Sequence, residues 1–206
     1  MTDQDRPQIY LLTPAHFDAE TFADTLAPVL DAAAIACLRL RFASDDDSEV
    51  ARAADAVRAL AHARDIPLVI DRHLALVERL GLDGVHLTDG SKSVRKCREA
   101  LGADPIVGTW CGTSRHDGMS AGEAGADYVS FGPVGDTALG AGDKVDPELF
   151  SWWSEVIELP IVAEGALTSD LVRAFAPITD FFAFGDEIWR ADDPAAALKA
   201  LDAAIG

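Results

Sequence analysis

Cysteine and basic residues are both scarce in this chain, and the two shortages exclude different classes of protein. The three cysteines, Cys37, Cys97 and Cys111, are an odd number and lack the paired spacing of a metal site. No disulfide framework is expected, and the thiols are predicted to be reduced, as in a cytoplasmic protein. Lysine and arginine total 17 against 35 aspartates and glutamates, which gives a net charge of −18. This charge repels nucleic acids and anionic membranes, so we expect neither as a partner.

Long apolar runs are absent as well. No stretch resembles a signal peptide or an apolar span of about 20 residues, so no membrane-spanning segment is expected. The first apolar run is followed by Thr13-Pro14-Ala15-His16 and not by a Gly-x-Gly-x-x-Gly turn, which argues against an open dinucleotide-binding sheet. No linker or repeat divides the 206 residues, so we expect one domain over 1–206.

Short apolar runs alternate with helical patterns eight times along the chain. The runs have the length and composition of buried parallel strands, and eight β-then-α units favour a closed (β/α)₈ TIM barrel of the α/β class. The predicted strands are Ile9–Thr13, Cys37–Arg41, Pro67–Ile70, Gly84–Leu87, Ile106–Trp110, Tyr128–Phe131, Ile161–Glu164 and Phe181–Phe184. The predicted helices are Ala19–Ala33, Glu49–Arg64, Leu74–Leu80, Val94–Leu101, Gly118–Ala124, Pro147–Val156, Ser169–Phe175 and Pro194–Ile205.

Local signals mark helix starts and one long loop. Ser48, the run Thr168-Ser169-Asp170 and Asp193 stand at the starts of helical runs, and Asp193 precedes a proline at the first helical position. The Gly/Asp-rich segment Gly132–Lys144 follows the sixth strand and is longer than a tight barrel requires. Loops of this kind are often functional.

Catalytic groups of such barrels lie at the carboxyl ends of the strands. Arg39 and Arg41 are two residues apart on a strand, so they point to the same face and need anions near them. They form either a clamp for a phosphate or carboxylate, or internal salt bridges to Asp71, Glu164 or Asp186.

A histidine and several carboxylates complete the candidate site. His86 lies on an apolar strand, where it is either a hydrogen-bonded core histidine or a catalytic group. Asp71 and Asp89, with Asp186 or Glu187, offer the oxygen ligands that Mg²⁺ prefers.

Strand-end motifs follow one another along almost the whole chain. They are Ile9–Thr13, Leu38-Arg39-Leu40-Arg41, Pro67–Arg72, Gly84-Val85-His86-Leu87, Gly125–Val134 and Ile161–Ala166. In this order they resemble the motifs of the thiamine-phosphate synthase family and its thiazole tautomerase branch. The run Gly84-Val85-His86-Leu87 is the most specific of them.

The resemblance implies a reaction between small phosphorylated heterocycles. A pyrimidine-methyl diphosphate loses diphosphate with the help of Mg²⁺, and a thiazole phosphate captures the resulting cation through its nitrogen. The resemblance places Arg39 and Arg41 at the diphosphate and Asp71 at the metal. At the thiazole phosphate it places Thr137, the loop of Gly165 and the backbone amides after the eighth strand, at Gly185. Barrels of this family often associate, so a homo-oligomer is compatible with the resemblance.

The chain departs from the family at several of these positions. Asp89 would have to replace a second metal ligand whose position falls on Ser91, and Lys144 would have to replace a lysine whose position falls on Gly140. Glu164 stands beside the Gly165–Ala166 turn, where its charge would repel a phosphate by a few kcal/mol at an effective dielectric of about 20. The other departures are Ile70 for an asparagine, Arg41 for a lysine, Trp110 for a serine, Leu139 for a threonine and Asp186 for a small residue.

These departures support a second hypothesis, a paralogue without synthase activity. It would be an isomerase of a related heterocycle or a ligand-binding, regulatory barrel. An isomerase needs a general acid or base close to the transferred proton, and His116, His86 and Glu164 are the candidates.

The arrangement of the charged groups distinguishes the two hypotheses. An open cluster of Arg39, Arg41, Asp71 and Asp89 would favour the synthase. An ion pair of either arginine with Glu164 or Asp186 would close the phosphate site and favour the paralogue.

Overall fold

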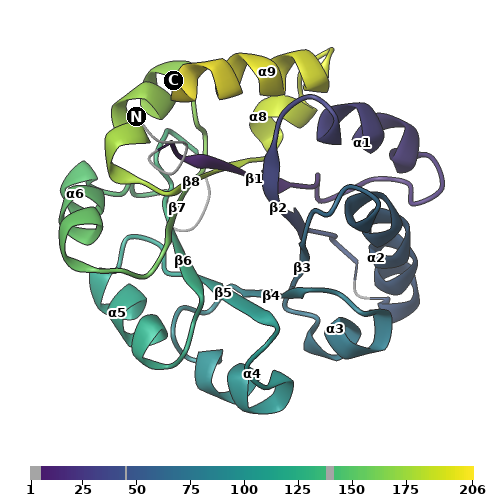
Figure 1. The fold of residues 1–206 in the computed structure, drawn as a ribbon, viewed down its shortest axis with the longest axis horizontal. Coiled ribbons are helices and arrows are strands. Elements are labelled where there is room, and N and C mark those ends of the chain that lie inside the picture. Colours follow the sequence, from purple (N-terminus) through teal and green to yellow (C-terminus); the bar gives the residue numbers. More distant parts are fainter. Residues whose placement is uncertain (1–5, 45, 138–141) are drawn as a thin grey trace.

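A computed structural model describes residues 6–44, 46–137 and 142–206. Eight parallel strands form a closed ring in the order of the sequence, with the helices around it (Figure 1). The strands are β1 Gln8–Leu12, β2 Ile35–Leu40, β3 Leu68–Asp71, β4 Gly84–Leu87, β5 Ile106–Trp110, β6 Tyr128–Phe131, β7 Ile161–Glu164 and β8 Phe181–Phe184. The (β/α)₈ barrel predicted from the alternation of apolar runs and helical patterns is confirmed.

The helices form the outer layer of the barrel (Figure 1). They are α1 Phe22–Leu30, α2 Asp47–His62, α3 Leu74–Leu80, α4 Val94–Leu101, α5 Arg115–Glu123, α6 Pro147–Val156, α7 Ser169–Phe175, α8 Asp186–Trp189 and α9 Pro194–Ile205, with a short 3₁₀ turn, η1, at Ala176–Ile178. Among the described residues, no helix combines the length and the apolar character needed to cross a membrane.

The alternation of side chains along each strand divides the core into two parts. Outward-facing residues such as Leu38, Leu40 and Ile70 pack against the helices. The inward-facing residues form a separate apolar cluster of Tyr10, Leu12, Cys37, Val69, Tyr128, Val162 and Ala183. Because neighbouring positions on a strand face opposite ways, Arg39, Asp71, His86, Ser130 and Glu164 share the inward face with this cluster. The interior of the barrel is therefore partly polar.

Some element bounds differ from the predicted ones because side chains cap the backbone. The predicted helix Ala19–Ala33 is shorter, since the carboxylate of Asp18 accepts from the N–H groups of Glu20 and Thr21 and holds a turn there. Helix α5 begins three residues before the predicted Gly118, because the hydroxyl of Ser114 accepts from the N–H of Asp117. The first three strands also lie one or two residues from their predicted positions.

Candidate active site at the carboxyl ends of the strands

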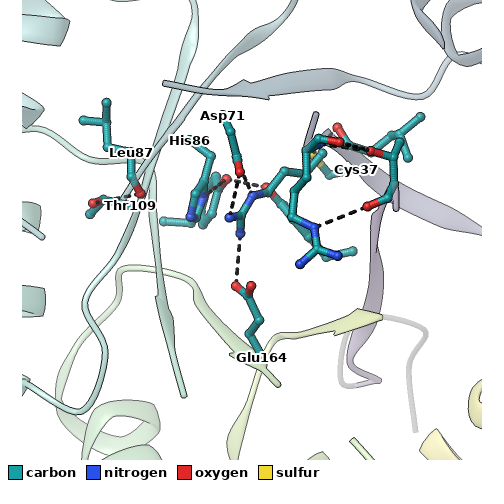
Figure 2. A network of polar contacts seen from close by, with 12 residues as sticks. Cys37, Asp71, His86, Leu87, Thr109 and Glu164 are labelled. Carbon is teal, nitrogen blue, oxygen red and sulfur yellow. Dashed lines mark hydrogen bonds and ion pairs between the residues drawn. The ribbon is translucent and has the colours of Figure 1, made fainter. Parts of the chain in front are cut away.

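Arg39 lies inside the barrel between two acids from other strands. Its Nε donates to Asp71 Oδ1 at 2.6 Å and its Nη1 to Glu164 Oε2 at 3.0 Å. Asp71 and Glu164 reach toward one another across the interior from β3 and β7 (Figure 2). The Arg39 side chain is 5% exposed. Burial by itself would lower the pKa of the guanidinium, but the charges of Asp71 and Glu164 outweigh it and raise that pKa well above its ordinary value.

Arg41 follows β2 and lies at the rim of the barrel. Thr13 holds its backbone on both sides: the Thr13 hydroxyl accepts from the Arg41 N–H at 3.0 Å and donates to the Arg41 carbonyl at 2.9 Å. The guanidinium donates to Asp186 Oδ1 at 3.2 Å. Both arginines are therefore in ion pairs with acids, which is the second of the two arrangements that the spacing of Arg39 and Arg41 allows.

His86 is a core histidine in the structure. Its Nδ1 lies 2.8 Å from the hydroxyl of Tyr128, which in turn lies 2.5 Å from the hydroxyl of Tyr10. Burial, and then the charge of Arg39, lower the pKa of His86 well below its usual value, so the ring is neutral. Gly108 makes room for this chain of contacts, because a Cβ there would lie 1.9 Å from the Tyr128 ring.

Two buried polar atoms of this interior have no hydrogen-bond partner among the described residues. They are Nε2 of His86 and the hydroxyl oxygen of Ser130. His86 is fully buried and Ser130 is 1% exposed, so neither side chain is open to bulk solvent. Because His86 is fully buried, a substrate at the open rim cannot contact its ring. His86 is therefore poorly placed to transfer a proton to or from such a substrate.

An open cavity of about 200 Å³ lies at the rim between the ends of β7 and β8. Four residues predicted to contact the diphosphate or the thiazole phosphate line it together: Arg41, Thr137, Gly165 and Gly185. Gly165 has φ +100°, a backbone conformation that glycine adopts without strain. The loops after the seventh and eighth strands are where TIM barrels often bind phosphate.

Acidic side chains also line this cavity. Glu164, Asp186 and Glu187 all contribute to its wall, and Arg41 is the one cation among the described residues that line it. The Glu187 carboxylate bridges two loops: Oε1 accepts from the N–H of Leu167 at 3.0 Å and Oε2 from the N–H of Gly185 at 2.8 Å. The electrostatic field in the cavity is therefore unfavourable for a free anion.

The remaining predicted residues lie apart from this cavity. Lys144 is exposed and pairs with Asp136 at 2.9 Å within the loop after β6. Leu139 and Gly140 of the same loop lie outside the described residues. Ile70 faces the helices as part of the outer core.

The two predicted metal ligands occupy different surroundings. Both carboxylate oxygens of Asp71 accept from Arg39, at 2.6 and 3.3 Å. Asp89 is exposed, accepts from the Ser93 hydroxyl at 2.6 Å, and lines a second cavity of about 330 Å³ together with Arg72 and Lys96. In the part of the chain that the structure describes, no three histidine, cysteine or acidic side chains form a group that could hold a metal.

Comparisons with known proteins identify the family. The chain is 41% identical to the thiamine-phosphate synthase of Rhodospirillum centenum, over 93% of this chain and 94% of that protein. It is 37% identical to the thiamine-phosphate synthase of Hyphomonas neptunium, over 98% and 97% of the two chains. The family model of thiamine monophosphate synthase matches residues 9–179. The chain belongs to the thiamine monophosphate synthase family.

The fold of a solved structure agrees with this assignment. The thiamine phosphate pyrophosphorylase of Pyrococcus furiosus superimposes with a TM-score of 0.82 over 98% of this chain and 96% of that one. The sequences are 20% identical, so this likeness shows the fold alone. The family model and the relatives, and not this fold likeness, confirm the resemblance that the strand-end motifs predict.

Several interior groups of this family member were not predicted as part of the site. Tyr128 contacts His86 and Tyr10, Ser130 lies on the same face of β6 as Tyr128, and burial raises the pKa of both tyrosines above the ordinary value. Their signal in the sequence is alternation, since Tyr128 and Ser130 are two apart on an otherwise apolar strand. The bridging role of Glu187 has no such signal, because it depends on two loops that meet only in the folded barrel.

Proposed function

We propose that the chain is a thiamine-phosphate synthase, which joins a pyrimidine-methyl diphosphate to a thiazole phosphate with loss of diphosphate. The observation that carries the proposal is the 41% identity to a protein of that name over 93% of this chain. The rim cavity, lined by Arg41, Thr137, Gly165 and Gly185, supports it by its position. The ion pairs of Arg39 with Glu164 and of Arg41 with Asp186 match the arrangement expected of a paralogue, but the relatives, all thiamine-phosphate synthases by name, give no support to an isomerase or a regulatory barrel.

Departure of diphosphate requires positive charge near the leaving oxygens. In this proposal Arg41 supplies it at the rim, where its side chain is 24% exposed. Arg39 lies deeper in the barrel than Arg41. It acts on the leaving group only if a diphosphate oxygen replaces Asp71 or Glu164 as its hydrogen-bond acceptor. The Thr137 hydroxyl and the backbone near Gly165 and Gly185 orient the thiazole phosphate.

Magnesium is part of the proposal, with Asp71 and Asp89 as its carboxylates. Magnesium is usually held by one or two carboxylates plus substrate phosphates, so two acids are sufficient if the ion enters with the diphosphate. Each Asp71 oxygen has lone pairs beyond its bond to Arg39, and Asp89 has one oxygen that does not bind Ser93. The ion, when bound, would neutralise charge on the diphosphate.

We further propose a cytoplasmic protein that acts on small phosphorylated heterocycles. All three cysteines are free and buried, which agrees with a reducing compartment. Association with further copies of the chain stays a prediction.

A quenched assay with both phosphorylated precursors and Mg²⁺ tests the activity. We expect thiamine phosphate and diphosphate to form in equal amounts, and chelation of the metal to stop the reaction. Arg41→Gln should lower kcat/KM by about tenfold to a thousandfold, because it removes the charge at the leaving group. Arg173→Gln, on the exposed side of α7, is the matched control and should leave the rate unchanged.

No product from correctly folded protein would refute the synthase. Product formation at an unchanged rate in Arg41→Gln would show that another cation serves the diphosphate.

A further inference from the structure

The second cavity, of about 330 Å³, lies between the segments that follow β3 and β4. These strands stand across the ring from β7 and β8, and the second cavity shares no lining residue with the rim cavity (Figure 1). Leu74, Leu87 and Cys97 form the apolar part of its lining, and Leu87 and Cys97 are buried. It therefore offers an apolar surface at a place from which the proposed reaction uses only Asp89.

Positive charge dominates the polar part of this lining. Arg72 and Lys96 are both exposed, and neither forms an ion pair among the described residues. Asp89 is the one acid of the described lining, and its Oδ2 accepts from the Ser93 hydroxyl at 2.6 Å. Two cations beside a single acid attract anions locally, although the net charge of −18 repels them at long range.

Neither cation is placed where local structure favours it. Arg72 has φ +61°, in the left-handed region that few residues other than glycine adopt. Backbone hydrogen bonds hold it there, from its N–H to the carbonyl of His86 at 3.0 Å and from the N–H of Leu74 to its own carbonyl at 2.9 Å. Lys96 lies in the first turn of α4, where the helix dipole disfavours a cation and no acid is present. The stability of these segments does not explain the two cations, whereas binding of an anion between them does.

We propose that the second cavity binds a small organic phosphate, at a site separate from the proposed reaction. Arg72 and Lys96 donate charge-assisted hydrogen bonds to the phosphate oxygens, and two cations match the nearly double charge of a phosphate monoester near pH 7. The Thr88 hydroxyl adds a further donor. The apolar part of the ligand packs on the leucines and the cysteine of the lining. The inference uses only the lining residues and does not depend on the synthase reaction.

An NMR titration with phenyl phosphate tests the proposal, because it reports on the two cavities separately. The titration is run without Mg²⁺ at constant ionic strength, and the amide signals of Thr88 and Ser93 follow the second cavity. We expect both signals to move and to saturate. Inorganic phosphate should move the same signals with an affinity at least about fivefold lower, because it has no apolar part to bury.

A double variant removes the two charges of the site. Arg72→Gln combined with Lys96→Gln should weaken the binding of phenyl phosphate in the second cavity at least about tenfold. The matched control combines Arg52→Gln with Lys199→Gln. These two residues are exposed on α2 and α9, outside the lining, and their replacement should leave the affinity unchanged.

Three results would overturn the proposal. One is a response of the amides of Gly165 and Gly185, in the rim cavity, with none at Thr88 and Ser93. Another is the same affinity in the double variant as in the unmodified protein. The third is an equal affinity for phenyl phosphate and inorganic phosphate, which would reduce the site to a general contact for anions.

The quenched assay keeps this proposal apart from the synthase itself. The double variant should form product at the unmodified rate, and a loss of about tenfold or more would make the second cavity part of the reaction site. Absence of product from the unmodified protein refutes the proposed reaction, and the response of Thr88 and Ser93 to phenyl phosphate is still expected.

Discussion

His86 is a neutral base in the interior of the barrel, and this makes the folded state sensitive to acid. Its pKa is lowered by burial and then by Arg39, whereas in an unfolded chain a histidine titrates near about 6.5. Below that pH the unfolded chain binds a proton that the folded chain does not. Stability is therefore lost as the pH falls from about 6.5 toward the folded pKa, by at most about 1.4 kcal/mol per pH unit.

Urea unfolding between about pH 7.5 and pH 5 measures this effect. The free energy of unfolding should fall less steeply with acid in His86→Gln than in the unmodified protein. His116→Gln, on the exposed side of α5, is the control and should follow the unmodified curve. Parallel curves for His86→Gln and the unmodified protein would contradict a neutral His86.

The partners of Arg39 show what a sequence can say about a single side chain. Alternation along the strand predicts that Arg39 and Arg41 face the same way, and the charges predict that they need acids. Asp71 and Glu164 were both candidate partners, but the choice between a salt bridge and an open clamp depends on distances across the ring. Those distances are set when the barrel closes, and the sequence pattern of a single strand carries no information about them.

Helix α9 depends on a side-chain cap. Asp193 precedes Pro194, and its carboxylate accepts from the N–H of Ala196 at 2.9 Å. Asp193→Ala should lower the free energy of unfolding by about 1 kcal/mol, because it leaves that N–H without its acceptor. Thermal or urea unfolding measures the change. Asp192→Ala removes the same charge one residue earlier and should have little effect; equal losses in both variants would assign the effect to charge.

The helix starts show where sequence patterns succeed and fail. Asp193 caps α9 as predicted, and α7 starts within the predicted run Thr168-Ser169-Asp170, with Thr168 as its cap. The predicted cap at Ser48 is wrong, since Asp46 accepts from the N–H groups of Ser48 and Glu49 and the helix begins at Asp47. Asp46, Asp47 and Ser48 can each cap a helix, so the residue types alone do not decide which of them does. Helix α8 is four residues long, too short to show a helical period, so it was not predicted.

The net charge of −18 destabilises the compact folded state through repulsion among the acidic side chains. Salt screens this repulsion over a Debye length of about 10 Å at 0.1 M. We expect the Tm to rise by about 2–4 °C for each kcal/mol that screening contributes, between low and moderate concentrations of NaCl. KCl at the same ionic strength should give the same rise. A constant or falling Tm would show that ion pairs such as Arg98 with Asp127 outweigh the repulsion.

Closure of the ring also determines when the edge strands gain their last hydrogen-bonded neighbours during synthesis. β1 pairs with β2 on one side and with β8 on the other, and β8 is also the second neighbour of β7. When β1 to β7 have emerged from the ribosome and β8 has not, the sheet therefore still has two unpaired edges, at β1 and at β7. Such edges invite pairing with other chains. A single late strand removes both, so the last part of the barrel to be translated protects the first.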